Sequence, residues 1–190
     1  EYIDKEIIEF IDSIDNGIEM PESKINIYSL QEIIKNLNPF WNENISETEQ
    51  FNKAVELMQE ILKREIKKAE SIKKGNELVR KCLKKSKKEF IILPDPRLPK
   101  KHLIENKNIK FAIYPDNKKN WISLAIPIKE KSFKSKKLFP KSWAGFEKEE
   151  LEKISQRKGA LFCHKNRFII VTKTKDSAIE LTKKALKEKD

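Results

Sequence analysis

The sequence has few of the cysteines that crosslink small folds through disulfides or zinc. It has only 2 cysteines, Cys82 and Cys163, which lie far apart and outside any CxxC pattern, so a disulfide scaffold and a cysteine zinc site are excluded. It has no stretch of about 18 consecutive apolar residues, the length that a membrane helix needs. We therefore expect a folded intracellular protein, located in the cytoplasm, nucleus or mitochondrion.

Charge, by contrast, is abundant and uneven. The chain carries 41 Lys and Arg against 30 Asp and Glu, a formal net charge of +11. Residues 1–60 are mostly acidic, whereas residues 63–88 and 129–141 are dense in lysine. Clustered cations displace counterions from phosphate backbones, so nucleic acid is the leading candidate partner. The alternative is a lysine-rich composition that only fills solvated faces.

The first half of the chain has helical periodicity. Apolar residues recur at three- and four-residue steps over residues 2–14, and this stripe ends at a polar turn before Gly17. A short helix follows, and the aromatic pair Phe40 and Trp41 is expected to fill a core. A longer stripe begins after Ser46 and extends to Lys85 unless Gly75 bends it. Unbroken, it would be a connector helix of about 58 Å.

Short β-rich runs replace this pattern after residue 88, separated by turn sequences that favour antiparallel hairpins. Two further amphipathic helices are expected near residues 146–154 and 176–187. The sequence therefore predicts an α+β protein: an N-terminal helical segment and a long connector helix, then an antiparallel sheet domain with packed helices. The expected boundaries are 1–45, 46–85 and 86–190.

Two groups of motifs resemble one family. Residues 10–18 (FIDSIDNGI) and 37–42 (LNPFWN) resemble the DxxDNG and LNPxWN segments of the melanocyte proliferating gene (MYG) family, exonucleases of the DHH type. Four later stretches look like its IYPD, SFxSR, PxxWxGL and GxxFxH motifs, in the same order: residues 113–116 (IYPD), 132–136 (SFKSK), 140–146 (PKSWAGF) and 159–164 (GALFCH). The resemblance covers essentially the whole chain and maps to the C-terminal half of the family.

This resemblance implies a metal-dependent phosphodiester hydrolase, expected to be a 3′ to 5′ RNA exonuclease. Its Mn²⁺ or Mg²⁺ pair would be held mainly by an upstream DHH-like domain of the same protein, and the chain opens at Glu1 without a Met, as a part of a longer protein would. Asp15 aligns with the last metal ligand of the family, with Asp12 as the alternative one turn earlier. Each has an alternative as an ordinary helix-ending carboxylate. We expect no stoichiometric metal in this chain alone and assign it no catalytic residue.

The resemblance also implies a substrate-binding set in the second half of the chain. Lysine at position 136 keeps the charge of the family's arginine but loses its bidentate fork for phosphate. The tryptophan either stacks on a base or is a buried structural residue, and the histidine either contacts phosphate or bonds to backbone. The full set is Ser135, Lys136, Trp143, His164, Lys165 and Arg167.

Two departures from the family leave the function open. Bulky residues at 166–171 replace a glycine-rich stretch, and residues 155–159 keep only the first Ser and last Gly of an SGIPG-like turn. Glycines let a backbone approach phosphate, so binding here is either shifted to side chains such as Arg167 or weakened. The alternatives are a catalytically inactive nucleic-acid or nucleotide binding module and a small-nucleotide phosphatase. Expected partners are single-stranded RNA or another phosphoester and the upstream domain; a homo-oligomer stays open, and no membrane partner is expected.

Overall fold

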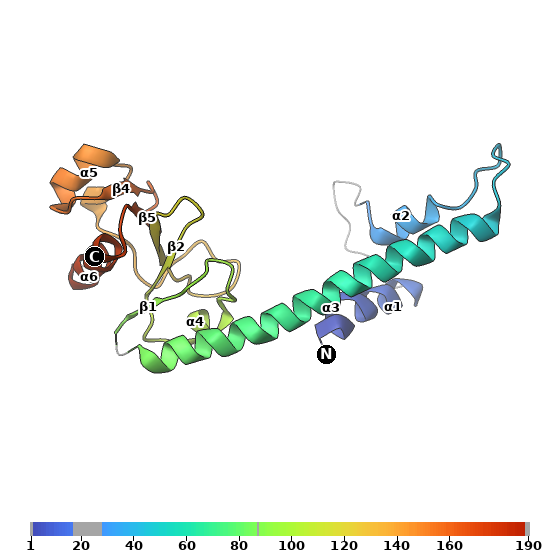
Figure 1. The fold of residues 1–190 in the computed structure, drawn as a ribbon, viewed down its shortest axis with the longest axis horizontal. Coiled ribbons are helices and arrows are strands. Elements are labelled where there is room, and N and C mark those ends of the chain that lie inside the picture. Colours follow the sequence, from blue (N-terminus) through green and yellow to red (C-terminus); the bar gives the residue numbers. More distant parts are fainter. Residues whose placement is uncertain (1, 17–27, 87, 189–190) are drawn as a thin grey trace. The chain divides into compact units, whose positions relative to one another are not determined.

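The computed structural model describes residues 2–16, 28–86 and 88–188. The chain divides into two compact units, residues 1–71 and 72–190, and the division falls inside one long helix (Figure 1). The turn expected at Gly17 lies outside the described residues.

The first unit is helical. A π-helical turn, η1 (Asp4–Ile8), continues into α1 (Glu9–Asp15), and α2 (Leu30–Lys35) and the start of α3 (Glu47–Lys85) follow. Ser29 caps α2 because its hydroxyl accepts a hydrogen bond from the backbone N–H of Glu32 at 3.3 Å. The three helices predicted from periodicity are therefore confirmed.

Much of the apolar surface of this unit is uncovered within the described residues. Phe40 and Trp41 are 55% and 97% exposed, so the expectation that they fill a core is wrong. A groove of about 440 Å³ lies among the helices and is lined by apolar and amide side chains: Ile8, Ile11, Ile34, Asn38, Phe51, Ala54, Val55, Met58, Gln59, Ile61 and Leu62. Among the side chains that the structure describes here, the lining has no titratable group.

The second unit is built on a five-stranded sheet with the order β1-β2-β3-β5-β4. The strands are β1 (Phe90–Ile92), β2 (Phe111–Pro115), β3 (Trp121–Ala125), β4 (Ala160–Cys163) and β5 (Ile169–Thr172). The α+β class is confirmed. All pairs are antiparallel except β1 with β2, which is parallel because the chain crosses over through α4 (Lys101–Glu105) instead of turning in a hairpin. The sheet is therefore mixed.

Helices cover both faces of this sheet. Successive side chains of a strand point to opposite faces, so Phe111 and Ile113 join one core while Ala112 and Tyr114 join the other. The first core is completed by η2 (Lys141–Trp143), α5 (Lys148–Ser155) and α6 (Lys175–Lys187). The second is completed by α4 and the C-terminal end of α3.

Gly75 does not divide α3, so of the two alternatives the unbroken helix from Glu47 to Lys85 is the one observed. A Cβ atom at this position would lie 2.6 Å from Cδ of Pro99, well inside van der Waals contact. The glycine is buried because it allows the Pro99 ring to approach the helix.

Lysine side chains close three helices of this unit at their C-terminal ends, where backbone carbonyls lack helical partners. Lys136 Nζ donates to the carbonyl oxygen of Leu103 in α4 at 2.8 Å, and Lys184 Nζ donates to that of Ser155 in α5 at 2.6 Å. Lys137 Nζ donates to the carbonyl oxygen of Glu188, after α6, at 2.8 Å. Some of the lysines that give the chain its positive net charge therefore stabilise helix ends within the fold.

Candidate substrate-binding site

The turn between β4 and β5 presents an oriented histidine. The backbone N–H of Asn166 donates to Nδ1 of His164 at 3.0 Å, so the neutral imidazole carries its proton on Nε2. The ring lies against Phe168 with a centroid distance of 4.4 Å, which fixes its plane. Within the described residues, Nε2 has no hydrogen-bond partner. It is therefore available to donate to an anionic oxygen.

Two cations flank this imidazole in the chain. Lys165 is exposed, and Arg167 is half-buried with Nη1 donating to the carbonyl oxygen of Phe139 at 3.2 Å. In return, the backbone N–H of Phe139 donates to the carbonyl oxygen of Arg167 at 2.9 Å. These two bonds anchor the arginine, and its remaining guanidinium N–H groups can bind a ligand.

Arg167 also shows how this turn tolerates the loss of the family's glycines. Its φ angle is +60°, in the left-handed region that favours glycine. The backbone thus has a glycine-like conformation with an arginine side chain attached, which costs about 1 kcal/mol of strain. The turn places a fixed positive charge where a glycine would leave only backbone.

Lys136 does not belong to this turn. Its ammonium group faces three backbone carbonyl oxygens, those of Leu103 and Asn106 at 2.8 Å each and that of Ile109 at 3.4 Å. Burial, and secondarily the charge of Lys110, lowers the pKa of Lys136. All three ammonium hydrogens have acceptors in the protein, so the side chain caps α4 and does not point at a ligand.

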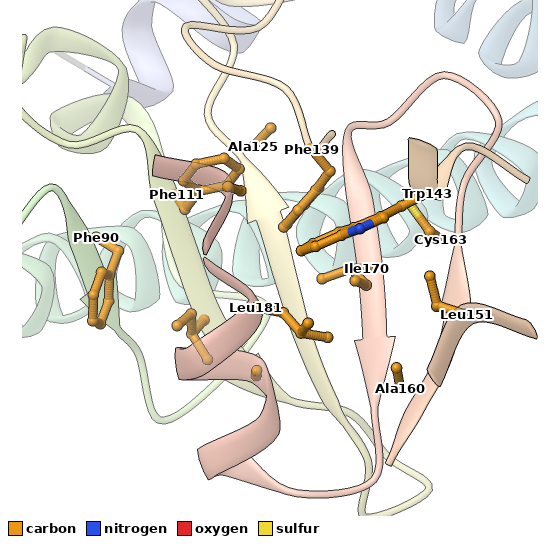
Figure 2. Packing of buried hydrophobic residues seen from close by; sticks show 13 residues of the cluster. Phe90, Phe111, Ala125, Phe139, Trp143, Leu151, Ala160, Cys163, Ile170 and Leu181 are labelled. Carbon is orange, nitrogen blue, oxygen red and sulfur yellow. The ribbon is translucent and has the colours of Figure 1, made fainter. Parts of the chain in front are cut away.

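The predicted residues Ser135 and Trp143 are also accounted for by the fold. Ser135 pairs with Pro127 in an isolated β-bridge. Trp143 is 4% exposed and stacks on Phe139, at a centroid distance of 6.3 Å and an interplanar angle of 26° (Figure 2). Figure 2 shows the Phe139 ring between Phe111 and Trp143. Because η2 folds the indole into the core, the burial supports the structural alternative for this residue.

Phe133 was not singled out from the sequence, although it lies in the SFxSR-like motif. Its side chain is fully exposed, at 104%, in the loop between Pro127 and Ser135. The available signal was one aromatic residue among the lysines of a polar loop, Lys129, Lys131 and Lys134.

The described residues do not by themselves make up a site for the metal pair that the resemblance implies. Asp12 is exposed on α1, and Asp15 is the last residue of that helix. The described part of the chain contains no group of three or more His, Cys, Asp and Glu side chains that could hold a metal ion. A metal pair needs several hard oxygen ligands, so Asp12 and Asp15 stay predictions as ligands.

Fold and site define a two-unit α+β protein whose second unit presents a histidine and two cations in one sheet turn. The chain belongs to the family described as Uncharacterised protein family (UPF0160), whose model, MYG1_exonuc, matches residues 1–186. The resemblance drawn from the motifs is therefore confirmed. The comparison with solved structures finds no match.

Curated relatives agree with this assignment. The chain is 31% identical over 206 residues to the MYG1 protein C694.04c of Schizosaccharomyces pombe, covering 98% of this chain and 63% of that protein. It is 30% identical over 203 residues to the MYG1 protein of Dictyostelium discoideum, covering 96% and 62%. It is 28% identical over 201 residues to the MYG1 exonuclease of Homo sapiens, covering 96% and 54%. The chain thus spans between about half and two thirds of these relatives, as their C-terminal part.

Within the ranges that the structure describes, no helix is both long and apolar enough to cross a bilayer.

Proposed function

We propose that this chain is the substrate-binding part of a nuclease that hydrolyses phosphodiester bonds of single-stranded RNA from the 3′ end. The β4–β5 turn carries the proposal, because His164, Lys165 and Arg167 offer three donors to phosphate within four residues. Relatives with the printed name MYG1 exonuclease supply the reaction class. Hydrolysis itself is proposed to use Mn²⁺ or Mg²⁺ in a longer protein, with Asp15 or Asp12 as one ligand.

The chemistry of the turn is binding and orientation. Nε2–H of His164 and the remaining N–H groups of Arg167 can each donate to a phosphate oxygen. Hydrogen bonds from a charged donor to a phosphate are shorter and about twice as strong as neutral ones. The imidazole is held by Asn166 and Phe168, and the guanidinium by Phe139, so little side-chain freedom is lost when a phosphate binds.

The test is the salt dependence of single-stranded RNA binding by the 190-residue chain. Arg167→Ala and Lys165→Ala should each reduce the slope of log affinity against log salt by about 0.7, the value for one phosphate contact. Arg167→Gly should reduce the slope as much as Arg167→Ala does. It should yield a more stable chain than Arg167→Ala, because glycine relieves the strain of the positive φ. His164→Ala should weaken binding, because the Nε2–H donor of the turn is lost.

Lys183→Ala is the matched control, an exposed lysine on α6 away from the turn in sequence. Its slope should equal that of the unsubstituted chain. If Lys183→Ala reduces the slope as much as Arg167→Ala does, bulk charge explains the binding and the turn is not the site. If the unsubstituted chain does not bind RNA at all, the proposed function is wrong.

A further inference from the structure

The loop between Pro127 and Ser135 holds a phenyl ring in solvent. Of all the large apolar side chains of the second unit, Phe133 is the most exposed, at 104%, and its neighbour Ile128 is 48% exposed. An isolated exposed apolar residue is common and carries no meaning by itself. Here, however, the ring stands among Lys129, Lys131 and Lys134, with Glu130 as the only acidic residue between the two ends of the loop.

Hydrogen bonds within the loop order its backbone. The backbone N–H of Ile128 donates to the carbonyl oxygen of Lys134 at 2.9 Å, and that of Ser132 donates to the carbonyl oxygen of Lys129 at 3.2 Å. The Ser132 hydroxyl accepts a hydrogen bond from the backbone N–H of Lys134 at 3.1 Å. These bonds bracket Phe133 on both sides, so the backbone that carries the ring is fixed while the ring itself has no cover.

The base of the loop is fixed as well. The backbone N–H of Lys136 donates to the carbonyl oxygen of Ile126 at 2.8 Å, and the side chain of Lys136 is held by α4. Ile126 is fully buried in the second core. The base of the loop is therefore anchored to the core of the second unit, and this holds the backbone of Phe133 in place.

We propose that Phe133 is a base-stacking residue for single-stranded nucleic acid, with the three loop lysines contacting the flanking phosphates. This inference rests on the proposed function and adds a second contact point. Phe133 contacts a base, whereas the β4–β5 turn contacts a phosphate. A flat, exposed ring on a fixed backbone offers a face to any base, and lysines on both sides match a chain in which bases alternate with phosphates. The stacking role that was one of two alternatives for Trp143 thus passes to the aromatic residue that is in solvent.

A membrane surface is the competing partner for a loop of this composition. Interfacial binding scales with the apolar area that enters the lipid, and this loop offers one phenyl ring and half of an isoleucine side chain. Stacking needs only one ring face, so nucleic acid is the partner that this loop fits better.

The experiment compares two strands of equal length, oligoadenylate and an abasic strand with the same sugar–phosphate backbone. The 190-residue chain should bind oligoadenylate more tightly by about 5- to 140-fold, the range of one stacked base. Phe133→Ala and Phe133→Leu should lower oligoadenylate affinity to the abasic level, because leucine is apolar but has no ring face. Phe133→Trp should retain or raise it. None of the three should change the salt slope.

Phe51→Ala serves as the control, since it removes another exposed phenyl group, 67% exposed, from the first unit. If the unsubstituted chain binds both strands with equal affinity while its salt slope still depends on Arg167, the role of Phe133 is overturned and the proposed function stands. Loss of binding to phosphatidylserine vesicles in Phe133→Ala, with oligoadenylate affinity unchanged, would overturn it in favour of a membrane. Failure of the unsubstituted chain to bind either strand would instead count against the proposed function.

Discussion

The ammonium group of Lys136 donates to the carbonyl oxygen of Leu103 at 2.8 Å, across 33 positions of sequence. The last lysine of the SFxSR-like stretch thus closes the C-terminal end of α4. Its three acceptors leave no hydrogen for a phosphate. The role of a charged residue in a motif therefore has to be inferred from its hydrogen-bond partners and not from its charge alone.

Lys136→Met is expected to destabilise the chain without changing nucleic-acid recognition. The substitution keeps the aliphatic stem but leaves the carbonyl oxygens of α4 without their donor, at a cost of about 1–3 kcal/mol. The free energy of unfolding in urea and the salt slope of RNA binding are both measured. Lys134→Met, an exposed lysine two residues earlier, is the control for stability. A reduced slope with unchanged stability in Lys136→Met would return this residue to the substrate site.

Gly75→Ala tests the contact between α3 and Pro99. Alanine has the higher helix propensity by about 1 kcal/mol, so an uncrowded site would be stabilised. The new Cβ, however, would meet Cδ of Pro99 at 2.6 Å, and we expect a net loss of about 1–3 kcal/mol. In the double variant with Pro99→Ala, the Gly75→Ala substitution should no longer destabilise. Additive losses in this double-mutant cycle would show that the two residues are not in contact.

The thiol of Cys163 predicts a pH dependence of stability. Burial raises the pKa of Cys163 from 9.0 to about 11, a rise that the charge of Arg167 partly opposes. The folded state therefore holds the proton more tightly than the unfolded state, so this contribution to stability is complete below pH 9.0 and is lost as the pH rises to about 11. Cys163→Ala should flatten the decline in unfolding free energy across this window. Identical pH profiles for Cys163→Ala and the unsubstituted chain would contradict the assignment.

Trp143→Ala should cost stability and should not act on base recognition. Removing a buried indole leaves a cavity beside Phe139 and is expected to cost about 3–5 kcal/mol. Trp143→Phe should cost less and should leave the preference for oligoadenylate over the abasic strand unchanged. A folded Trp143→Phe chain that loses this preference would give the indole the stacking role.

The chain alone should show no manganese-stimulated nuclease activity. The described carboxylates do not gather into a metal site, so we expect no stoichiometric Mn²⁺ in calorimetry and no effect of Asp15→Asn or Asp12→Asn on RNA binding. Hydrolysis by the purified chain that a chelator abolishes would contradict this. The same assay on a full-length protein separates the exonuclease from an inactive binding module, because only the exonuclease loses hydrolysis with Asp15→Asn.

Local features of the sequence predicted local features of the fold. Periodicity located α3 and α6, and the turn residues 165–167 located the hairpin between β4 and β5. The parallel pairing of β1 was missed because strand direction depends on a crossover through α4 and not on the strand's own residues.

The candidate site was predictable only in part, for a related reason. His164 was found through the resemblance of residues 159–164 to the GxxFxH motif, but the geometry of the motif aromatics depends on the tertiary structure. Trp143 and Phe133 look equivalent in sequence, yet one ring is in the core and the other is in solvent. The lysines around Phe133 are the only local difference, and they do not decide the outcome, because burial depends on which residues from elsewhere in the chain cover each ring.

The lysines that close helices also change how the surface of this protein reacts. An amine reagent or an acetyltransferase needs an accessible lysine nitrogen, and those of Lys136 and Lys184 are hydrogen-bonded to carbonyl oxygens at 2.6–2.8 Å. Acetylation at these two positions requires that the helix end opens first. Lysine footprinting of the second unit would therefore report local unfolding at Lys136 and Lys184, and simple exposure at lysines such as Lys165.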